Sequence, residues 1–190
     1  MTELRYLPDD DDVTEFTATV SEATDEYIIL DGTYFYPEGG GQPPDHGTLR
    51  WDGGHATVVD ARKNHGDVRH YVDSIEGEIP ASGTTVDGSI DAERRERLRR
   101  MHTAQHVVSR VVLDEYDATT AGNQIYEERS RIDFEPASFD DDDLAAIEEQ
   151  TNAVIERDLP VTKANRARDA VEDEVPAGRT QLDLIPDHVD

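Results

Sequence analysis

Two histidines, His102 and His106, stand four residues apart in this sequence. Side chains at that spacing on a helix lie on one face, so both imidazoles can face a common point. Neutral imidazole is the commonest protein ligand for transition metals, and such a pair can give zinc two nitrogen ligands. Thr103 stands where a His-Glu-x-x-His metalloprotease has its glutamate, so that enzyme class is not indicated. The pair alone is equally compatible with two histidines that bind no metal.

A glycine-rich segment, Glu38-Gly39-Gly40-Gly41-Gln42, lies earlier in the chain, within residues 31–47. Consecutive glycines allow positive φ angles and let the backbone approach a ligand closely. Gln42 offers both a donor and an acceptor, and Thr33 offers a hydroxyl. The segment therefore predicts either a small-molecule pocket or an ordinary glycine-rich β-turn.

Five arginines precede the histidines within seven positions, in a chain that has only 18 lysines and arginines. They are Arg94, Arg95, Arg97, Arg99 and Arg100. Arg95 and Arg99 fall on the helix face of His102, where they could contact a phosphate backbone. The alternative is that the arginines neutralise nearby carboxylates such as Glu93 and Glu96.

The composition is strongly acidic, with a formal net charge of -26 over 190 residues and only 35% hydrophobic residues. Apolar residues still recur periodically, so we expect a folded protein and not a disordered one. Its acidic surface suits a highly saline cytoplasm; the alternative is that the protein is acidic for no such reason. There is no cysteine, which fits an intracellular location. No apolar run has membrane length and no signal core is visible, so we expect a soluble cytoplasmic protein.

The elements that must position these residues fall into two parts, and together they predict an α+β fold. Residues 1–88 read as a small β-barrel-like domain, because short alternating segments are separated by turn residues. These segments are Phe16–Val20, Tyr27–Leu30, Thr33–Tyr36, His55–Asp60, Val68–Val72 and Thr85–Ile90. Residues 89–190 read as an α+β domain that begins with a helix capped by Asp91.

The remainder of the second part alternates between strand and helix patterns. A strand is expected at Ser130–Phe134, and a helix after the acidic run Asp140–Asp143. The buried stripe of that helix is expected to contain Leu144, Ile147, Thr151, Val154 and Ile155. Residues 160–164 are expected to form a strand and residues 166–173 a short helix, and residues 182–190 resemble the approach to another strand.

Residues 31–47, followed in order by Arg100-Met101-His102-Thr103-Ala104-Gln105-His106, resemble the editing domain of alanyl-tRNA synthetase. The likeness is greatest to the free-standing AlaX-type trans-editing proteins. It runs along nearly the whole chain and includes Arg131-Ile132-Asp133-Phe134, Arg179-Thr180 and Ile185-Pro186. It implies a β-barrel-like domain joined to an α+β domain, and a hydrolase for the ester of tRNA(Ala) mischarged with serine or, in some members, glycine.

The resemblance also assigns roles to individual residues. His102 and His106 match two zinc ligands, and the family takes the other two from a later Cys-x-x-x-His motif. Thr33 and Gln42 match positions at the amino-acid pocket, beside Gly40 and Gly41, and we expect Thr33 to contact the serine hydroxyl. Zinc could acidify a water or anchor the substrate amino group. Arg95, Arg99 and Arg100 are the expected tRNA contacts.

The family's second zinc motif does not occur before Asp190, and His188 is not at a ligand position of the family. We therefore expect a piece of a longer protein, and in this 190-residue form we expect the zinc site to be empty or weakly occupied. The partners expected are mischarged tRNA(Ala) but neither DNA nor a membrane, and the chain should be a monomer or weak dimer. The alternatives are a non-catalytic tRNA-binding module, a metal-free inactive fragment, or editing of Ser-tRNA(Thr), against which the glycine motif argues.

Overall fold

The computed structural model describes residues 1–7, 12–162, 166–167 and 170, and every structural statement below concerns these residues. The chain divides into two compact units. The first contains Met1–His102 and Gln124–Arg131, and the second contains Thr103–Asn123 and Ile132–Asp190. The units divide the chain after His102, within its longest helix, whereas the predicted boundary lies between residues 88 and 89.

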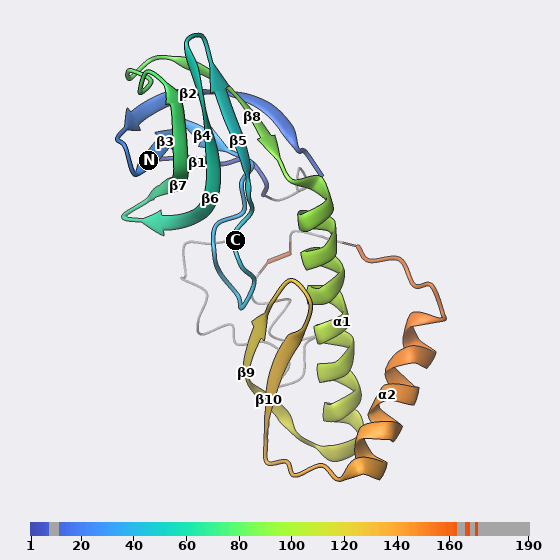
Figure 1. The fold of residues 1–190 in the computed structure, drawn as a ribbon. Helices are drawn as coiled ribbons and strands as arrows, with labels where there is room; N and C mark the ends of the chain where they lie inside the picture. The colour runs from blue at the N-terminus through green and yellow to red at the C-terminus, as the bar shows by residue number, and fades with distance from the viewer. Residues whose placement is uncertain (8–11, 163–165, 168–169, 171–190) are drawn as a thin grey trace. The chain divides into compact units, whose positions relative to one another are not determined.

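The first unit is built on a closed barrel of six strands (Figure 1), in the order β2-β3-β7-β6-β5-β8. The strands are β2 (Glu15–Ala23), β3 (Tyr27–Leu30), β5 (Gly47–Trp51), β6 (Gly54–Asn64), β7 (Asp67–Gly77) and β8 (Thr85–Ile90). All neighbours pair antiparallel. Alternate side chains point inward and form a core that includes Ile28, Leu30, Phe35, Leu49 and Val58, each 0% exposed. The predicted α+β fold with a barrel is confirmed.

Two short strands, β1 (Glu3–Leu4) and β4 (Gly32–Thr33), pair in parallel with each other. Along the chain, β1 precedes the first barrel strand and β4 follows β3. The strand expected over Thr33–Tyr36 is therefore wrong beyond its first residue. Side chains take up the backbone donors there: the Thr33 hydroxyl accepts from the Phe35 N–H at 3.1 Å, and Asp45 accepts from the Tyr36 N–H at 2.6 Å. The chain consequently leaves the extended ladder after Thr33, ahead of the glycine-rich segment.

The strand β5 was not expected, because only Leu49 in it is fully buried and it begins at a glycine. That glycine is required by packing. A Cβ atom on Gly47 would lie 2.1 Å from the Ser89 carbonyl oxygen, so only glycine lets β5 pack this closely on β8.

The helix α1 (Ala92–Tyr116) begins where the sequence predicted. The Asp91 carboxylate accepts a hydrogen bond from the Arg94 N–H at 2.9 Å, which satisfies one of the free amides of the first turn. The helix carries the residues from Arg94 to His102 in the first unit and His106 in the second. It is therefore the element on which most of the expected site residues are arranged.

The second unit contains α2 (Asp141–Ile155) and most of the two-stranded sheet of β9 (Thr119–Ile125) and β10 (Ser130–Glu135). Its core gathers apolar side chains from α1, α2 and the chain after α1: Val111, Val112, Ala118 and Ile147. The helix α2 is capped by Asp140, whose carboxylate accepts from the amides of Asp142 and Asp143. The helix predicted at the acidic run is thus confirmed, although it begins inside the run, at Asp141, and not after it.

The buried stripe predicted for α2 is only partly correct. Ile147 and Thr151 are buried, but Leu144 is 53% exposed and Ile155 is 54% exposed, so the helix presents a narrower apolar face than expected. Pro160 to Thr162 are not in a strand, and the rest of the strand expected over residues 160–164 lies outside the described residues. The same is true of most of residues 166–173 and of all of 179–190. Among the described residues, no helix is both long and apolar enough to cross a bilayer.

Candidate functional site

The glycine-rich segment forms a tight turn that presents Gln42. Gly39 and Gln42 exchange two backbone hydrogen bonds, of 3.2 Å and 3.0 Å, across the turn. The two central residues, Gly40 and Gly41, have φ angles of 59° and 77°. Positive φ at both central positions defines a type I′ turn, which favours glycine because side chains are strained there. The carbonyl of Gly41 also accepts from the Ile125 N–H at 2.7 Å.

Gln42 meets the first of the two histidines. Its side chain is 6% exposed, and its Oε1 lies 2.8 Å from Nδ1 of His102 on α1. A carbonyl oxygen only accepts hydrogen bonds, so this bond requires the hydrogen on Nδ1 and leaves Nε2 as the accepting nitrogen of the ring. The structure thereby brings together a residue of the glycine motif and a residue of the histidine motif, sixty positions apart.

Thr33 lies in a different environment, in the interior of the barrel. Its side chain is 0% exposed, and its hydroxyl lies 2.8 Å from Nε2 of His70, which is also 0% exposed. Nδ1 of His70 donates to the Ile28 carbonyl at 2.9 Å, so Nε2 accepts from the Thr33 hydroxyl. Burial lowers the pKa of His70 to about 4, although the Ile28 carbonyl opposes the shift. The Thr33 hydroxyl is thus hydrogen-bonded to a neutral histidine inside the protein.

Arg95 is a buried structural residue. It is 5% exposed, and its guanidinium pairs with Asp45, which is 1% exposed. It also donates to the carbonyls of Val13 at 2.8 Å and Tyr34 at 2.6 Å. This arrangement joins α1 to the segment around the glycine turn. The contact with tRNA expected of Arg95 is not supported by this geometry, because its donors face carbonyls and a carboxylate of the chain itself.

Arg94, which directly precedes Arg95 on α1, is 8% exposed. Its Nε lies 3.1 Å from Oε1 of Glu127, without the alignment of a hydrogen bond. Burial, together with the positive charge of Arg94, lowers the pKa of the neighbouring His46. The charges at the start of α1 are therefore largely balanced by carboxylates of the first unit.

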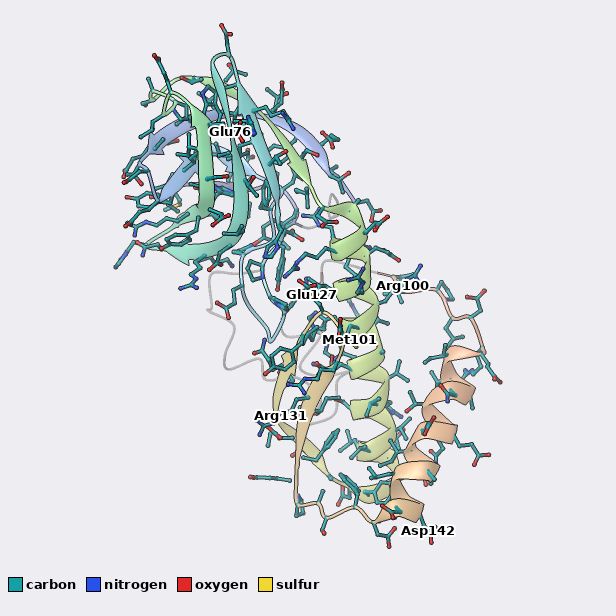
Figure 2. All side chains as sticks on the ribbon, viewed as in Figure 1. Glu76, Arg100, Met101, Glu127, Arg131 and Asp142 are labelled. Carbon is teal, nitrogen blue, oxygen red and sulfur yellow. The ribbon has the colours of Figure 1, made fainter. Side chains whose placement is uncertain are left out.

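Arg99 and Arg100 are more exposed, at 39% and 79% of the side chain. Arg99 contacts Asp12, and Arg100 pairs with Glu96 at 2.8 Å one turn earlier on the helix. Figure 2 shows Arg100 and Glu127 on different sides of α1. The alternative prediction, in which arginines neutralise carboxylates such as Glu96, is confirmed for Arg100. Its exposed ion pair is weak enough to exchange for a phosphate.

His106 lies one turn beyond His102 on α1 and belongs to the second unit. Among the described residues, no group of three or more His, Cys, Asp or Glu side chains is arranged to hold a metal. Asp45 and His70 were not predicted as site residues from the sequence. His70 could have been found, since it alternates with Val68 and Val72 at an inward position of a predicted strand. Asp45 gave no such signal, because its partner Arg95 is fifty positions away.

Comparison with known proteins gives a consistent set of relatives. A family model described as tRNA synthetases class II (A) matches residues 8–94. The alanyl-tRNA editing protein AlaX-M of Methanosarcina acetivorans is 42% identical over 167 residues, which is 85% of this chain and 68% of that protein. AlaX-M of Methanosarcina mazei is 45% identical over 74% of this chain and 59% of its own length. The alanine–tRNA ligase of Methanopyrus kandleri is 40% identical over 90% of this chain.

The share of each relative that is matched differs between these groups. The chain spans roughly two thirds of the AlaX-M proteins, with 68% and 59% of their lengths matched, and only 19% of the Methanopyrus kandleri ligase. The similarity therefore concerns one part of the ligase and most, but not all, of the AlaX-M proteins.

Proposed function

Because this chain belongs to the AlaX-type alanyl-tRNA editing family, we propose that it acts as an aminoacyl-tRNA deacylase. Its substrate is tRNA(Ala) mischarged with serine or glycine, and it hydrolyses the ester between amino acid and tRNA in trans. The observation that carries the proposal is the 42% identity to AlaX-M over 85% of the chain. The hydrogen bond between Gln42 and His102 supports it, because it joins the two motifs on which the resemblance rests.

We propose that zinc is held by His102 and His106. The donor set fits this metal in part: two imidazoles four residues apart lie on one face of α1, and the bond to Gln42 places the hydrogen of His102 on Nδ1, so Nε2 is the nitrogen that carries the lone pair. Two nitrogens make half of a tetrahedral site, and the described residues offer no group of three or more metal-binding side chains. When bound, zinc would supply a Lewis acid for ester hydrolysis.

The amino-acid pocket is proposed to lie at the turn formed by Gly40 and Gly41, with Gln42 as its polar side chain. Glycines at 40 and 41 leave the backbone open to close approach by a substrate. The proposed contact between Thr33 and the serine hydroxyl would require substrate to displace His70 from a hydroxyl that is 0% exposed. We therefore favour a structural role for Thr33, as the hydrogen-bond partner of the buried His70.

Binding of tRNA is proposed to use Arg99 and Arg100. They are the two predicted contacts whose side chains are at least 39% exposed, and a phosphate could replace their carboxylate partners. The chain has a net charge of -26, so long-range attraction to a polyanion is unfavourable. Recognition should therefore depend on local contacts, stacking and shape more than on counterion release.

The proposal is tested by hydrolysis of Ser-tRNA(Ala) in excess Zn²⁺, with Ala-tRNA(Ala) as the substrate that must be spared. A second arm adds a C-terminal segment that carries a Cys-x-x-x-His motif, and a third uses Ser-tRNA(Thr). We expect hydrolysis of Ser-tRNA(Ala) well above that of Ala-tRNA(Ala), and little of Ser-tRNA(Thr). Tight tRNA binding without hydrolysis in either of the first two arms would instead favour a non-catalytic tRNA-binding module.

A further inference from the structure

We propose that Gln42 is a positioning residue that fixes the tautomer and the orientation of the His102 ring. The contact is the 2.8 Å hydrogen bond from Nδ1 of His102 to Oε1 of Gln42. The consequence for zinc rests on the proposed function, whereas the tautomer itself does not. This role differs from a place in the amino-acid pocket, because Gln42 acts here through His102.

The backbone of Gln42 is fixed by its surroundings. The type I′ turn holds it by two hydrogen bonds with Gly39, and the Gly41 carbonyl next to it accepts from the Ile125 N–H at 2.7 Å. Its side chain is 6% exposed, so neighbouring atoms restrict its rotamers. The amide oxygen is therefore held in place before any ligand arrives.

The fixed amide oxygen selects one tautomer of the His102 ring. A neutral imidazole carries one hydrogen, and a carbonyl acceptor at Nδ1 keeps that hydrogen there. Nε2 then keeps its lone pair, which is the one a metal requires. If the amide were turned by 180°, its NH₂ group would donate to Nδ1, and the hydrogen would move to Nε2 and block that nitrogen.

Fixing this tautomer should strengthen metal binding. Groups that hydrogen-bond the second nitrogen of a metal-binding histidine orient the ring and raise its basicity, and their loss weakens metal binding by about 10–100-fold. The glycine turn thus has a specific purpose in this chain, which is to bring one amide oxygen to one imidazole. Neither of the two motifs shows this connection when it is examined alone.

The direct test is the ¹⁵N NMR spectrum of the histidine-labelled full chain without metal, with His102 assigned by substitution. We expect Nδ1 of His102 to be protonated and Nε2 unprotonated in the wild type. Gln42→Glu retains an acceptor and should keep this tautomer, whereas Gln42→Met has similar size but no acceptor and should give a mixture. A wild-type ring protonated at Nε2 would overturn the proposal, and so would a Gln42→Met spectrum identical to that of the wild type.

A titration with Zn²⁺ alone provides the second readout. Gln42→Met should weaken zinc binding by about 10–100-fold, and Gln42→Glu should bind at least as tightly as the wild type. Gln105→Met is the matched control, since Gln105 is also a buried glutamine, 5% exposed, and lies on α1 with His102. This substitution should leave the His102 tautomer unchanged. Equal zinc affinity of the wild type and Gln42→Met would overturn the metal part.

These readouts separate the inference from the proposed function. If the tautomer and zinc affinity respond as expected but mischarged tRNA is not hydrolysed, the role of Gln42 stands and the deacylase proposal fails. If hydrolysis occurs but the tautomer does not depend on Gln42, the deacylase proposal stands and the positioning role fails.

Discussion

The buried pair of His70 and Thr33 makes the folding stability of this protein depend on pH in a calculable way. Every polar atom of the pair has a partner only while His70 is neutral: Nδ1 donates to the Ile28 carbonyl, and Nε2 accepts from the Thr33 hydroxyl. That hydroxyl also accepts from the Phe35 N–H. Protonation of His70 would place a second hydrogen where Thr33 donates, inside a core cluster, and burial accordingly lowers the His70 pKa to about 4.

The sign and size of the effect follow from this shift. Below the ordinary histidine pKa of about 6.5 the unfolded chain takes up a proton at this position and the folded chain does not, so stability falls as pH falls. The loss is about 1.4 kcal/mol per pH unit between the two pKa values. It amounts to about 2 kcal/mol at pH 5 and to about 3 kcal/mol once the pH is below 4, where the folded form also becomes protonated.

The assay is urea unfolding of the wild type and of His70→Gln at pH 7, 6 and 5, at one ionic strength. His70→Gln cannot titrate, so the difference between the two proteins removes the contributions of the other histidines and of the carboxylates. The wild-type advantage should shrink by about 2 kcal/mol between pH 7 and pH 5. A difference that is constant over this range would contradict this prediction, because it would mean that His70 binds protons equally in the folded and unfolded chain.

Thr33→Val tests the other partner of the same pair. It removes the donor to Nε2 of His70 and the acceptor for the Phe35 N–H, which leaves buried polar atoms without partners. The free energy of unfolding should fall by about 1–3 kcal/mol, while the ratio of Ser-tRNA(Ala) to Ala-tRNA(Ala) hydrolysis stays unchanged. A lost ratio at unchanged stability would instead show that Thr33 contacts the serine hydroxyl.

Three further predictions concern the arginines and the cap of α2. Arg95→Leu leaves the buried Asp45 carboxylate unpaired and should lower the free energy of unfolding by about 3–5 kcal/mol in urea denaturation; a loss below 1 kcal/mol would contradict the assigned role. Arg99→Glu combined with Arg100→Glu should raise the KM for mischarged tRNA with little change in stability, and an unchanged KM would remove this surface from tRNA binding. Asp140→Ala should cost about 1 kcal/mol by loss of the α2 cap, measured by thermal unfolding, and no change would show that its hydrogen bonds contribute nothing.

Local patterns predicted the elements that depend on local chemistry. The strands Tyr27–Leu30 and Thr85–Ile90 have the expected bounds, and α1 begins after Asp91 because that carboxylate caps it. Hydrophobic periodicity and helix capping depend on a few adjacent residues, so they can be predicted from a single sequence. The strand β5 was not predicted, since it packs on β8 through the close approach of Gly47. That contact depends on a segment distant in the sequence.

The arrangement of the site depends on contacts between distant residues, and these were predicted less well. The spacing of His102 and His106 correctly placed both on one helix, but nothing in the sequence connects Gln42 to Nδ1 of His102. The charge of Arg95 suggested a phosphate ligand. In the structure Arg95 instead forms an ion pair with Asp45, fifty positions earlier in the sequence. A charged residue contributes to binding only if folding leaves it exposed, and exposure is a property of the tertiary structure.

The decisive experiment measures the initial rate of ester hydrolysis of Ser-tRNA(Ala) in excess Zn²⁺ for the wild type and for His102→Ala. Ala-tRNA(Ala) serves as the parallel substrate. The account predicts that the wild type releases serine much faster than alanine and that His102→Ala loses this activity while remaining folded. Equal rates for the wild type and His102→Ala, or equal hydrolysis of the two tRNAs, would contradict it.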